Sequence, residues 1–249
     1  MPRPHRLSMV IVVTALLLPI TFAYGKDTLY LGGAPWPPYF YLQDSNRPGG
    51  TDYLLLQTIL ARMDYQLLPE ILPEKRVTRG VNQGKIDVVL GAAYTPERAK
   101  NNYYSIPYRT ETVGYGYLDG KSFPVVEKDL ITRLKEGNTL ALNTSGWFGD
   151  DFFYHLAQPY QSQLVHIDSV ARRLEFLALG RVDLILDDTE VLAYNALKQG
   201  IDLTISEEVI QHQKIYFMFS RFSVDQDFMR EFNRLLAEHL QNAQPSHYQ

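Results

Sequence analysis

Apolar runs short enough for strands alternate along the chain with stretches in which apolar residues recur every three or four positions. That spacing over residues 50–63 predicts a helix with one apolar face. Residues 86–91, Ile-Asp-Val-Val-Leu-Gly, predict a strand without a wet face, as in a parallel sheet covered on both sides. Further elements of this unit are expected as strands at 28–32 and 65–70 and a short helix at 74–83. The first part of the chain therefore predicts a β-α-β-α-β unit.

The alternation restarts after an extended run over residues 110–118. The expected elements are helices at 129–135, 150–157, 169–179 and 189–198, and strands at 139–142, 164–167 and 182–186. A last strand over residues 214–219 precedes an amphipathic helix over 224–240. We expect the apolar face of this closing helix to pack back on the first unit.

This order of elements predicts an α/β protein with two Rossmann-like lobes, joined by a hinge that the chain crosses twice. We expect lobe 1 to comprise residues 26–111 with 215–249, and lobe 2 to comprise residues 112–214. Ligands of open α/β sheets bind at the carboxyl ends of the strands. A ligand site is therefore predicted in the cleft between the lobes, and we expect the lobes to close around the ligand by hinge motion.

The first 25 residues have the pattern of a secretory signal. A short basic start precedes an uncharged apolar run over residues 9–22, and Ala23 and Gly25 place small residues at a cleavage site. The alternative is a membrane anchor, but the apolar run is shorter than the ~20 residues that span a bilayer. We predict cleavage after Gly25 and a periplasmic location.

Composition removes several classes of function. The chain has no cysteine, which excludes disulfides, cysteine-ligated metals and thiol catalysis. Its net charge of −4 and the lack of a basic cluster argue against nucleic acid as a partner. The six histidines show no metal-binding spacing, and neither a G-x-S-x-G elbow nor a dinucleotide fingerprint occurs. We predict a monomer that binds a small molecule, with no catalytic residue, cofactor or metal.

Short motifs follow one another in a fixed order across the chain. They are Trp36-Pro37-Pro38-Tyr39, Gly50 with Asp52, Gln83-Gly84-Lys85-Ile86-Asp87, Thr95-Pro96-Glu97-Arg98-Ala99-Lys100, Ser105-Ile106-Pro107-Tyr108, and Leu179-Gly180-Arg181-Val182-Asp183 followed by Asp188. Each motif alone is weak, but in their joint order and spacing they resemble the amino-acid-type periplasmic solute-binding proteins (family 3). The resemblance implies the type II periplasmic binding fold.

The resemblance implies roles for two charged residues. Arg98 would bind the α-carboxylate of an amino acid, which suits a guanidinium because its planar fork takes a carboxylate bidentately. Asp188 would bind the α-ammonium from the opposite lobe. The alternatives are that Arg98 is a surface residue paired with Glu97 or Glu111, and that Asp188 caps the helix that follows it. Asp187 is a rival for the same role.

The resemblance also implies that Trp36 and Tyr39, just after the first strand, stack on the ligand. The alternative for Trp36 is that it only fastens its loop. Tyr94 is taken as a further contact. Ser145 lies in the turn Asn143–Gly146, where backbone N–H groups could meet an anion, although an ordinary capping turn fits the same residues.

Three departures from the family pattern bear on the ligand. Ala93 stands where members that bind amino acids usually have a hydroxyl, and Trp147 stands where a threonine is frequent. Glu74-Lys75-Arg76 occupies a helix start where an aromatic is common. The bulk of Trp147 and the added charge of Arg76 suggest, as a hypothesis, a smaller or more acidic ligand.

Three functions stay open at this stage. The first is binding of an amino acid or related carboxylate for delivery to an inner-membrane ABC permease. The second is a ligand sensor of the same fold that reports to a membrane signalling partner. The third is a cyclohexadienyl-type dehydratase, for which Asp187, Asp188 or Glu190 would serve as the general acid.

Overall fold

The computed structural model describes residues 27–43, 46–118, 129–144 and 146–243. Ten strands form one sheet in the order β4-β1-β5-β12-β7-β10-β8-β9, with β6 paired to β12 and β11 to β7. Their bounds are β1 Asp27–Gly33, β4 Tyr65–Ile71, β5 Val88–Ala93, β6 Asn102–Tyr104, β7 Arg109–Leu118, β8 Leu140–Leu142, β9 Leu164–His166, β10 Leu184–Asp188, β11 Leu203–Ile205 and β12 Gln211–Ser220. A separate ribbon pairs β2, Tyr41–Leu42, with β3, Pro48–Gly49.

Helices cover the sheet in both halves of the molecule. Their bounds are α1 Thr51–Arg62, α2 Glu74–Asn82, α3 Pro96–Ala99, α4 Leu130–Lys135, α5 Val170–Ala178, α6 Thr189–Gln199 and α7 Gln226–Ala243. Side-chain caps begin five of them. Thr95, Asp129, Ser169, Asp188 and Asp225 each accept a hydrogen bond from a backbone N–H in the first turn of the helix that follows.

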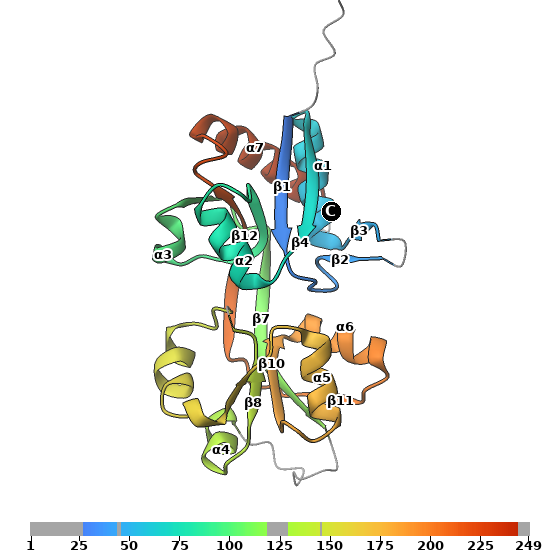
Figure 1. The fold of residues 1–249 in the computed structure, drawn as a ribbon, viewed down its shortest axis with the longest axis vertical. Coiled ribbons are helices and arrows are strands. Elements are labelled where there is room, and N and C mark those ends of the chain that lie inside the picture. Colours follow the sequence, from blue (N-terminus) through green and yellow to red (C-terminus); the bar gives the residue numbers. More distant parts are fainter. Residues whose placement is uncertain (1–26, 44–45, 119–128, 145, 244–249) are drawn as a thin grey trace, which may run out of the picture.

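Figure 1 shows the two lobes one above the other. Lobe 1 contains β1, β4, β5, β6, α1, α2, α3 and α7, and lobe 2 contains β8 to β11 with α4, α5 and α6. In lobe 1, β1 pairs in parallel with both β4 and β5, as expected for the β-α-β-α-β unit. Phe228, Phe232 and Leu236 of α7 join Leu56 and Ile59 of α1 in the lobe 1 core. The closing helix therefore packs on the first unit.

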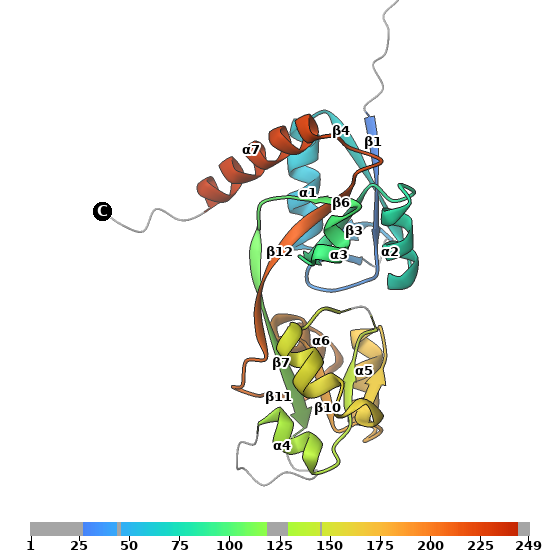
Figure 2. The same ribbon diagram turned by 90° about the vertical axis from the view of Figure 1, so that its left-hand side faces the viewer.

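Strands β7 and β12 connect the lobes and form the hinge (Figure 2). They pair antiparallel from Gln211 opposite Val113 to Ile215 opposite Arg109. The lobe boundaries expected at residues 111/112 and 214/215 thus fall inside two strands that run on from one lobe to the other. A boundary on a continuous strand has no sequence signal, because the strand pattern does not change there.

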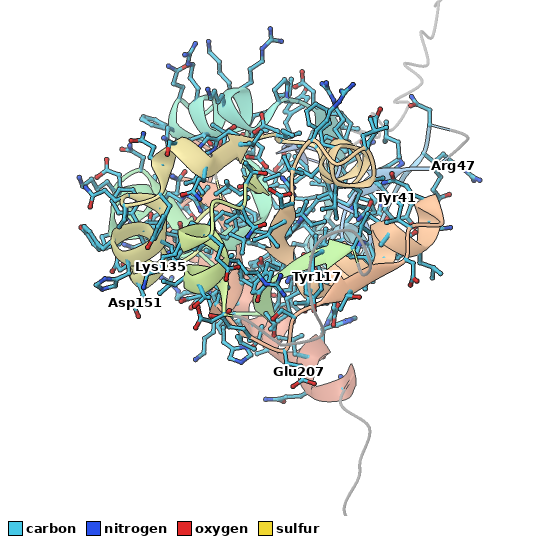
Figure 3. All side chains as sticks on the ribbon, turned by 90° about the horizontal axis from the view of Figure 1, so that it is seen from below. Tyr41, Arg47, Tyr117, Lys135, Asp151 and Glu207 are labelled. Atoms are coloured by element: carbon cyan, nitrogen blue, oxygen red, sulfur yellow. The ribbon has the colours of Figure 1, made fainter. Side chains whose placement is uncertain are left out.

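Lobe 2 differs in detail from the expected elements. Residues Phe152–Ala157, expected as an ordinary helix, form a π-helix. Strands β6 and β11, of three residues each, were not expected from the sequence. Figure 3 looks onto the lobe 2 end, where the labelled Lys135, Asp151 and Glu207 are exposed to solvent. Within the described ranges, no helix is long and apolar enough to cross a membrane.

Candidate ligand-binding cleft

A cavity of about 170 Å³ lies between the lobes, and both lobes and the hinge contribute to its lining. Lobe 1 supplies the loop after β1, one face of α2, the end of β5 and Arg98. Lobe 2 supplies the loop after β8, Asp168, Arg173 of α5 and the end of β10, while the hinge supplies Glu111 and Gln213. The carboxyl ends of β1, β5, β8 and β10 therefore meet here, as the fold rule for open α/β sheets requires.

Two indole rings form apolar walls of the cavity. Trp147 comes from lobe 2 but packs against the lobe 1 core, so it reaches across the cleft. Trp36 comes from lobe 1 and packs against a core cluster of lobe 2. The Trp36 ring lies directly on Gly91, where an added Cβ would be 2.8 Å from a ring carbon and where φ is +69°. Both features require glycine at this position.

Arg98 lines the lobe 1 side of the cavity. Its backbone N–H donates to the Thr95 hydroxyl, which caps α3, at 3.2 Å. Its Nη1 donates to the Ala93 carbonyl, also at 3.2 Å, which holds the guanidinium near the end of β5. A guanidinium carries five N–H donors in a planar fork, a geometry that suits a carboxylate.

An ion pair between Arg173 and Asp187 forms the opposite wall. The Arg173 side chain is fully buried, its Nη2 contacts Asp187 Oδ2, and its Nη1 donates to the Ile167 carbonyl at 2.7 Å. Asp187 Oδ1 accepts from the Asp188 backbone N–H at 2.8 Å and from the Trp36 indole N–H at 3.4 Å. The last bond joins lobe 1 to lobe 2 at the cavity surface.

A second arginine, Arg109 at the start of β7, is surrounded by carboxylates. Its Nε lies 3.1 Å from Asp52 of lobe 1, and its Nη1 lies 3.4 Å from Asp188 of lobe 2 and 3.9 Å from Glu111. The guanidinium also stacks 3.7 Å from the centre of the Tyr39 ring, a cation–π contact. We call Arg109, Asp52, Asp188, Glu111 and Tyr39 the hinge cluster. It ties both lobes to the hinge.

Asp188 is fully engaged in this cluster. One carboxylate oxygen accepts from the Glu190 backbone N–H at 2.8 Å and so caps α6, and the other lies 3.0 Å from the Tyr39 hydroxyl. Asp188 is not among the residues that line the cavity, although its neighbour Asp187 is. Burial raises the pKa of Asp188 to about 6, against the lowering effect of its backbone hydrogen bond and of Arg109.

Burial has the same effect on the other acids of the hinge cluster. It raises the pKa of Asp52, although Arg109 and the Tyr108 hydroxyl oppose the shift. It raises the pKa of Glu111 to about 8, with a further rise from the negative charges of Asp188 and Asp187. Glu111 is only 5 % exposed, yet it lines the cavity.

The structure brings together only part of the predicted site. Trp36, Arg98 and Trp147 line the cavity, whereas Tyr39 and Asp188 lie in the adjoining hinge cluster. Ser145 lies outside the described residues.

Two expected residues lie elsewhere. Tyr94 is half-exposed, stacks on Tyr104 and is not part of the lining. Arg76 is exposed and does not line the cavity either, because Glu74, Val77 and Thr78 lie on the face of α2 that does. Helix periodicity turns Arg76 away, so the hypothesis that it adds positive charge to the pocket is not supported.

Five polar residues of the site were not assigned a ligand role from sequence. Glu111 and Arg109 stand as isolated charges near the start of a β run, which is the one signal that could have indicated buried function. Arg173 lies on an ordinary amphipathic helix, and Gln213 lies beside further polar residues. Neither residue therefore stands out in the sequence as a candidate for the site. Glu74 lies in the segment Glu74-Lys75-Arg76, of which only Arg76 was considered as a ligand contact.

Among known proteins, a model of the bacterial extracellular solute-binding proteins, family 3, matches residues 31–244. A probable amino-acid-binding protein of Bacillus subtilis, YxeM, is 22 % identical over 242 residues, which cover 92 % of this chain and 88 % of that protein. Cysteine proteinase 1 of Entamoeba histolytica is 28 % identical over 142 residues, 45 % of each chain. The chain thus spans less than half the length of that proteinase, and it contains no cysteine that could act as a nucleophile.

Solved structures agree on the fold. A mutant of ArgBP from T. maritima has a TM-score of 0.74 at 22 % identity, with 87 % of this chain and 90 % of that chain covered. A histidine kinase sensor domain similar to periplasmic binding proteins has a TM-score of 0.73 at 18 % identity, with 89 % and 97 % covered. The two-lobed type II periplasmic binding fold predicted from the sequence is therefore confirmed.

Proposed function

The chain belongs to the bacterial extracellular solute-binding proteins, family 3, and we propose that it binds an amino acid or a closely related small carboxylate in the cleft between its lobes. Binding leaves the solute chemically unchanged and draws the two lobes together around it. The residues that would hold the solute are Arg98 on lobe 1 and the indoles Trp36 and Trp147.

The observation that carries this proposal is the composition of the cavity between the lobes, which both lobes line. It offers a guanidinium on one wall, a carboxylate on the other and two indole faces between them. A zwitterion of amino-acid size presents the complementary groups, because its carboxylate matches Arg98 and its ammonium matches an acid of lobe 2. Solutes with only one charge would leave one wall of the cavity unmatched.

The proposal also has to identify the acid that binds the ammonium group. Resemblance to the family assigns it to Asp188, whose carboxylate is already engaged by Tyr39, Arg109 and the α6 cap. Asp187 borders the cavity itself. Arg173 engages Asp187 as well, so access to the cavity decides between the two acids. We assign the first contact to Asp187, with Asp188 supporting it through the backbone N–H that it donates to the Asp187 carboxylate.

The relatives support the ligand class. The B. subtilis protein is described as a probable amino-acid-binding protein, and solved forms of ArgBP from T. maritima are bound to arginine. Delivery to an ABC importer in the periplasm is the first candidate role. A sensor role is the second, favoured by the similarity to a histidine kinase sensor domain. Uptake of labelled solute by cells that lack the protein separates the two roles, since only loss of delivery stops uptake.

A thermal-shift screen against amino acids, small dicarboxylates, polyamines and short sugars tests the proposal. A ligand at a hundred times its dissociation constant adds ~2.7 kcal/mol to the free energy of unfolding, which raises Tm by a few degrees. We expect amino acids to give such shifts and Arg98→Ala to abolish them. Arg230→Ala, on the exposed face of α7, is the matched control and should bind as the wild type does. Folded protein that responds to none of the amino acids would contradict the proposal.

A further inference from the structure

Two hydrogen-bond acceptors lie side by side on the hinge floor of the cleft. Glu111 on β7 and Gln213 on β12 are direct partners in the antiparallel ladder, and both line the cavity. Direct partners on one face of a sheet have Cβ atoms ~5 Å apart, so both side chains reach the same spot in the cavity. Neither residue belongs to the motifs that carry the family resemblance.

The Gln213 amide is oriented by its neighbour. A hydrogen bond from Gln213 lowers the pKa of Glu111, so the amide nitrogen donates to the carboxyl group. The amide oxygen, Oε1, is shielded from solvent and has no hydrogen-bond partner among the described residues. Because a buried acceptor without a donor is costly, a ligand N–H at this position gains more than a ligand carbonyl or methyl group would.

The charges around this floor also favour a cation. Asp187 is matched by Arg173, which contacts it directly. Glu111 lies 3.9 Å from Arg109, but Asp52 and Asp188 lie nearer to the same guanidinium, at 3.1 Å and 3.4 Å. Arg109 is therefore shared by three buried carboxylates. Glu111, the carboxylate of the three that borders the cavity, lies farthest from the Arg109 guanidinium.

We propose that Glu111 and Gln213 form a cation subsite, which selects a ligand with a second positively charged group beyond its α-ammonium, that is, a basic amino acid. The inference rests on the proposed function, since it adds a subsite to the same cleft. The side-chain ammonium or guanidinium donates to the Glu111 carboxylate and to Gln213 Oε1. Such a ligand supplies the charge that the hinge cluster lacks.

The protonation of Glu111 links this subsite to pH. Burial, together with the charges of Asp188 and Asp187, raises the pKa of Glu111 to about 8, so the ligand-free protein holds a proton there at neutral pH. A bound cation favours the carboxylate and expels that proton. Affinity for a basic ligand then falls by up to about tenfold for each pH unit below 8. Arg109 of the hinge and Asp187 and Asp188 of β10 act on Glu111 directly. The other ionisable residues that line the cavity are Glu74, Arg98, Asp168 and Arg173.

Calorimetric titration with L-arginine and its neutral isostere L-citrulline tests the subsite, because the two differ only in the charge of the side-chain end. We expect the wild type to prefer arginine by about tenfold or more, the range for a hydrogen bond to a charged group. Glu111→Gln should remove most of that preference by weakening arginine alone. Glu231→Gln, which deletes an exposed carboxylate on α7, is the control and should keep it.

Gln213→Met provides a second variant, because it removes the acceptor and leaves Glu111 in place. We expect it to lower the arginine preference by about threefold. Equal affinity of the wild type for the two ligands would overturn the subsite while leaving the proposed function intact. A preference for arginine that survives in Glu111→Gln would also overturn the subsite. An equal loss of affinity for arginine and citrulline in Glu111→Gln would overturn it too, because that result would place the α-ammonium at Glu111. If no amino acid binds, the proposed function itself fails, and the subsite fails with it.

Discussion

Two arginine–carboxylate groups meet at the end of β10, and they are built for different tasks. Asp187 and Asp188 are consecutive, and because strand side chains alternate between faces, one turns to the cleft and the other to the hinge. Asp187 is paired with a fully buried arginine of its own lobe, Arg173. Asp188 shares Arg109 with Asp52 of lobe 1 and Glu111 of the hinge.

The two groups differ in charge balance: positive and negative charges match around Arg173, whereas carboxylates outnumber the single cation around Arg109. Arg173 has one carboxylate and two backbone carbonyls as partners, so its charge is matched within lobe 2. Arg109 faces three carboxylates, and burial raises the pKa of each of them. The hinge cluster therefore contains carboxyl groups, Glu111 and Asp188, whose protonation changes near neutral pH, and it joins the two lobes.

Removal of the Arg109 charge tests the hinge cluster most directly. Arg109→Met leaves its buried carboxylates without a cation, and we expect the free energy of unfolding at pH 7 to fall by about 3–5 kcal/mol. Urea unfolding measures the change. The loss should shrink at pH 5, because carboxylates with raised pKa values then take up protons. Arg234→Met breaks only exposed pairs on α7 and should cost less than about 1 kcal/mol. Equal losses in the two variants would contradict a buried network.

The pH dependence of stability tests the excess of acid in the hinge cluster. The pKa of Glu111 is about 8 in the folded protein against 4.5 normally, so between these values the folded state binds more protons than the unfolded state. Its stabilising effect is complete below pH 4.5 and is lost as the pH rises through 8. Asp188, with a pKa of about 6, acts likewise between pH 3.8 and 6.

Glu111→Gln isolates the larger contribution, because glutamine mimics the protonated carboxyl group. We expect the ligand-free variant to be more stable than the wild type by roughly 4 kcal/mol at pH 8, and to match it below pH 4.5. Thermal unfolding across this pH range measures both. Glu231→Gln should follow the wild type throughout. A wild type whose Tm rises steadily from pH 5 to 8 while Glu111→Gln tracks it would refute the assignment.

Two glycines with similar backbone conformations allow the effect of backbone strain to be distinguished from the effect of contact with the Trp36 indole. Gly91 and Gly180 have φ values of +69° and +65°, but only at Gly91 would a Cβ meet a neighbour, the Trp36 ring. Gly180→Ala should cost about 1 kcal/mol through strain alone. Gly91→Ala should cost a similar amount and also weaken amino-acid binding by about tenfold, since Trp36 must shift. Equal ligand affinity in the two variants would remove Trp36 from the binding surface.

Sequence reasoning located the cleft better than its chemistry. The motif around Thr95 and Arg98 is local, because a helix cap and a strand end fix the arginine within a few residues of chain. Trp36 and Trp147 were proposed from loops that follow strands, and both line the cavity. Asp188 was proposed as well, but it lies in the hinge cluster. Its partners there could not be foreseen, because Tyr39 and Arg109 lie far from it along the chain.

The sequence by itself determined the two-lobed α/β fold, the order of its elements and the edge of the sheet at which the cavity lies, because apolar periodicity and turn motifs act over short stretches of chain. Tertiary structure alone decided which charges share the buried space. Glu111 lies opposite Gln213 because of the register between β7 and β12, two strands that are separated in the sequence by the whole of lobe 2. The loss of Asp188 from the cavity and the rise in the pKa of Glu111 depend on burial and on distant charges, which no local pattern encodes.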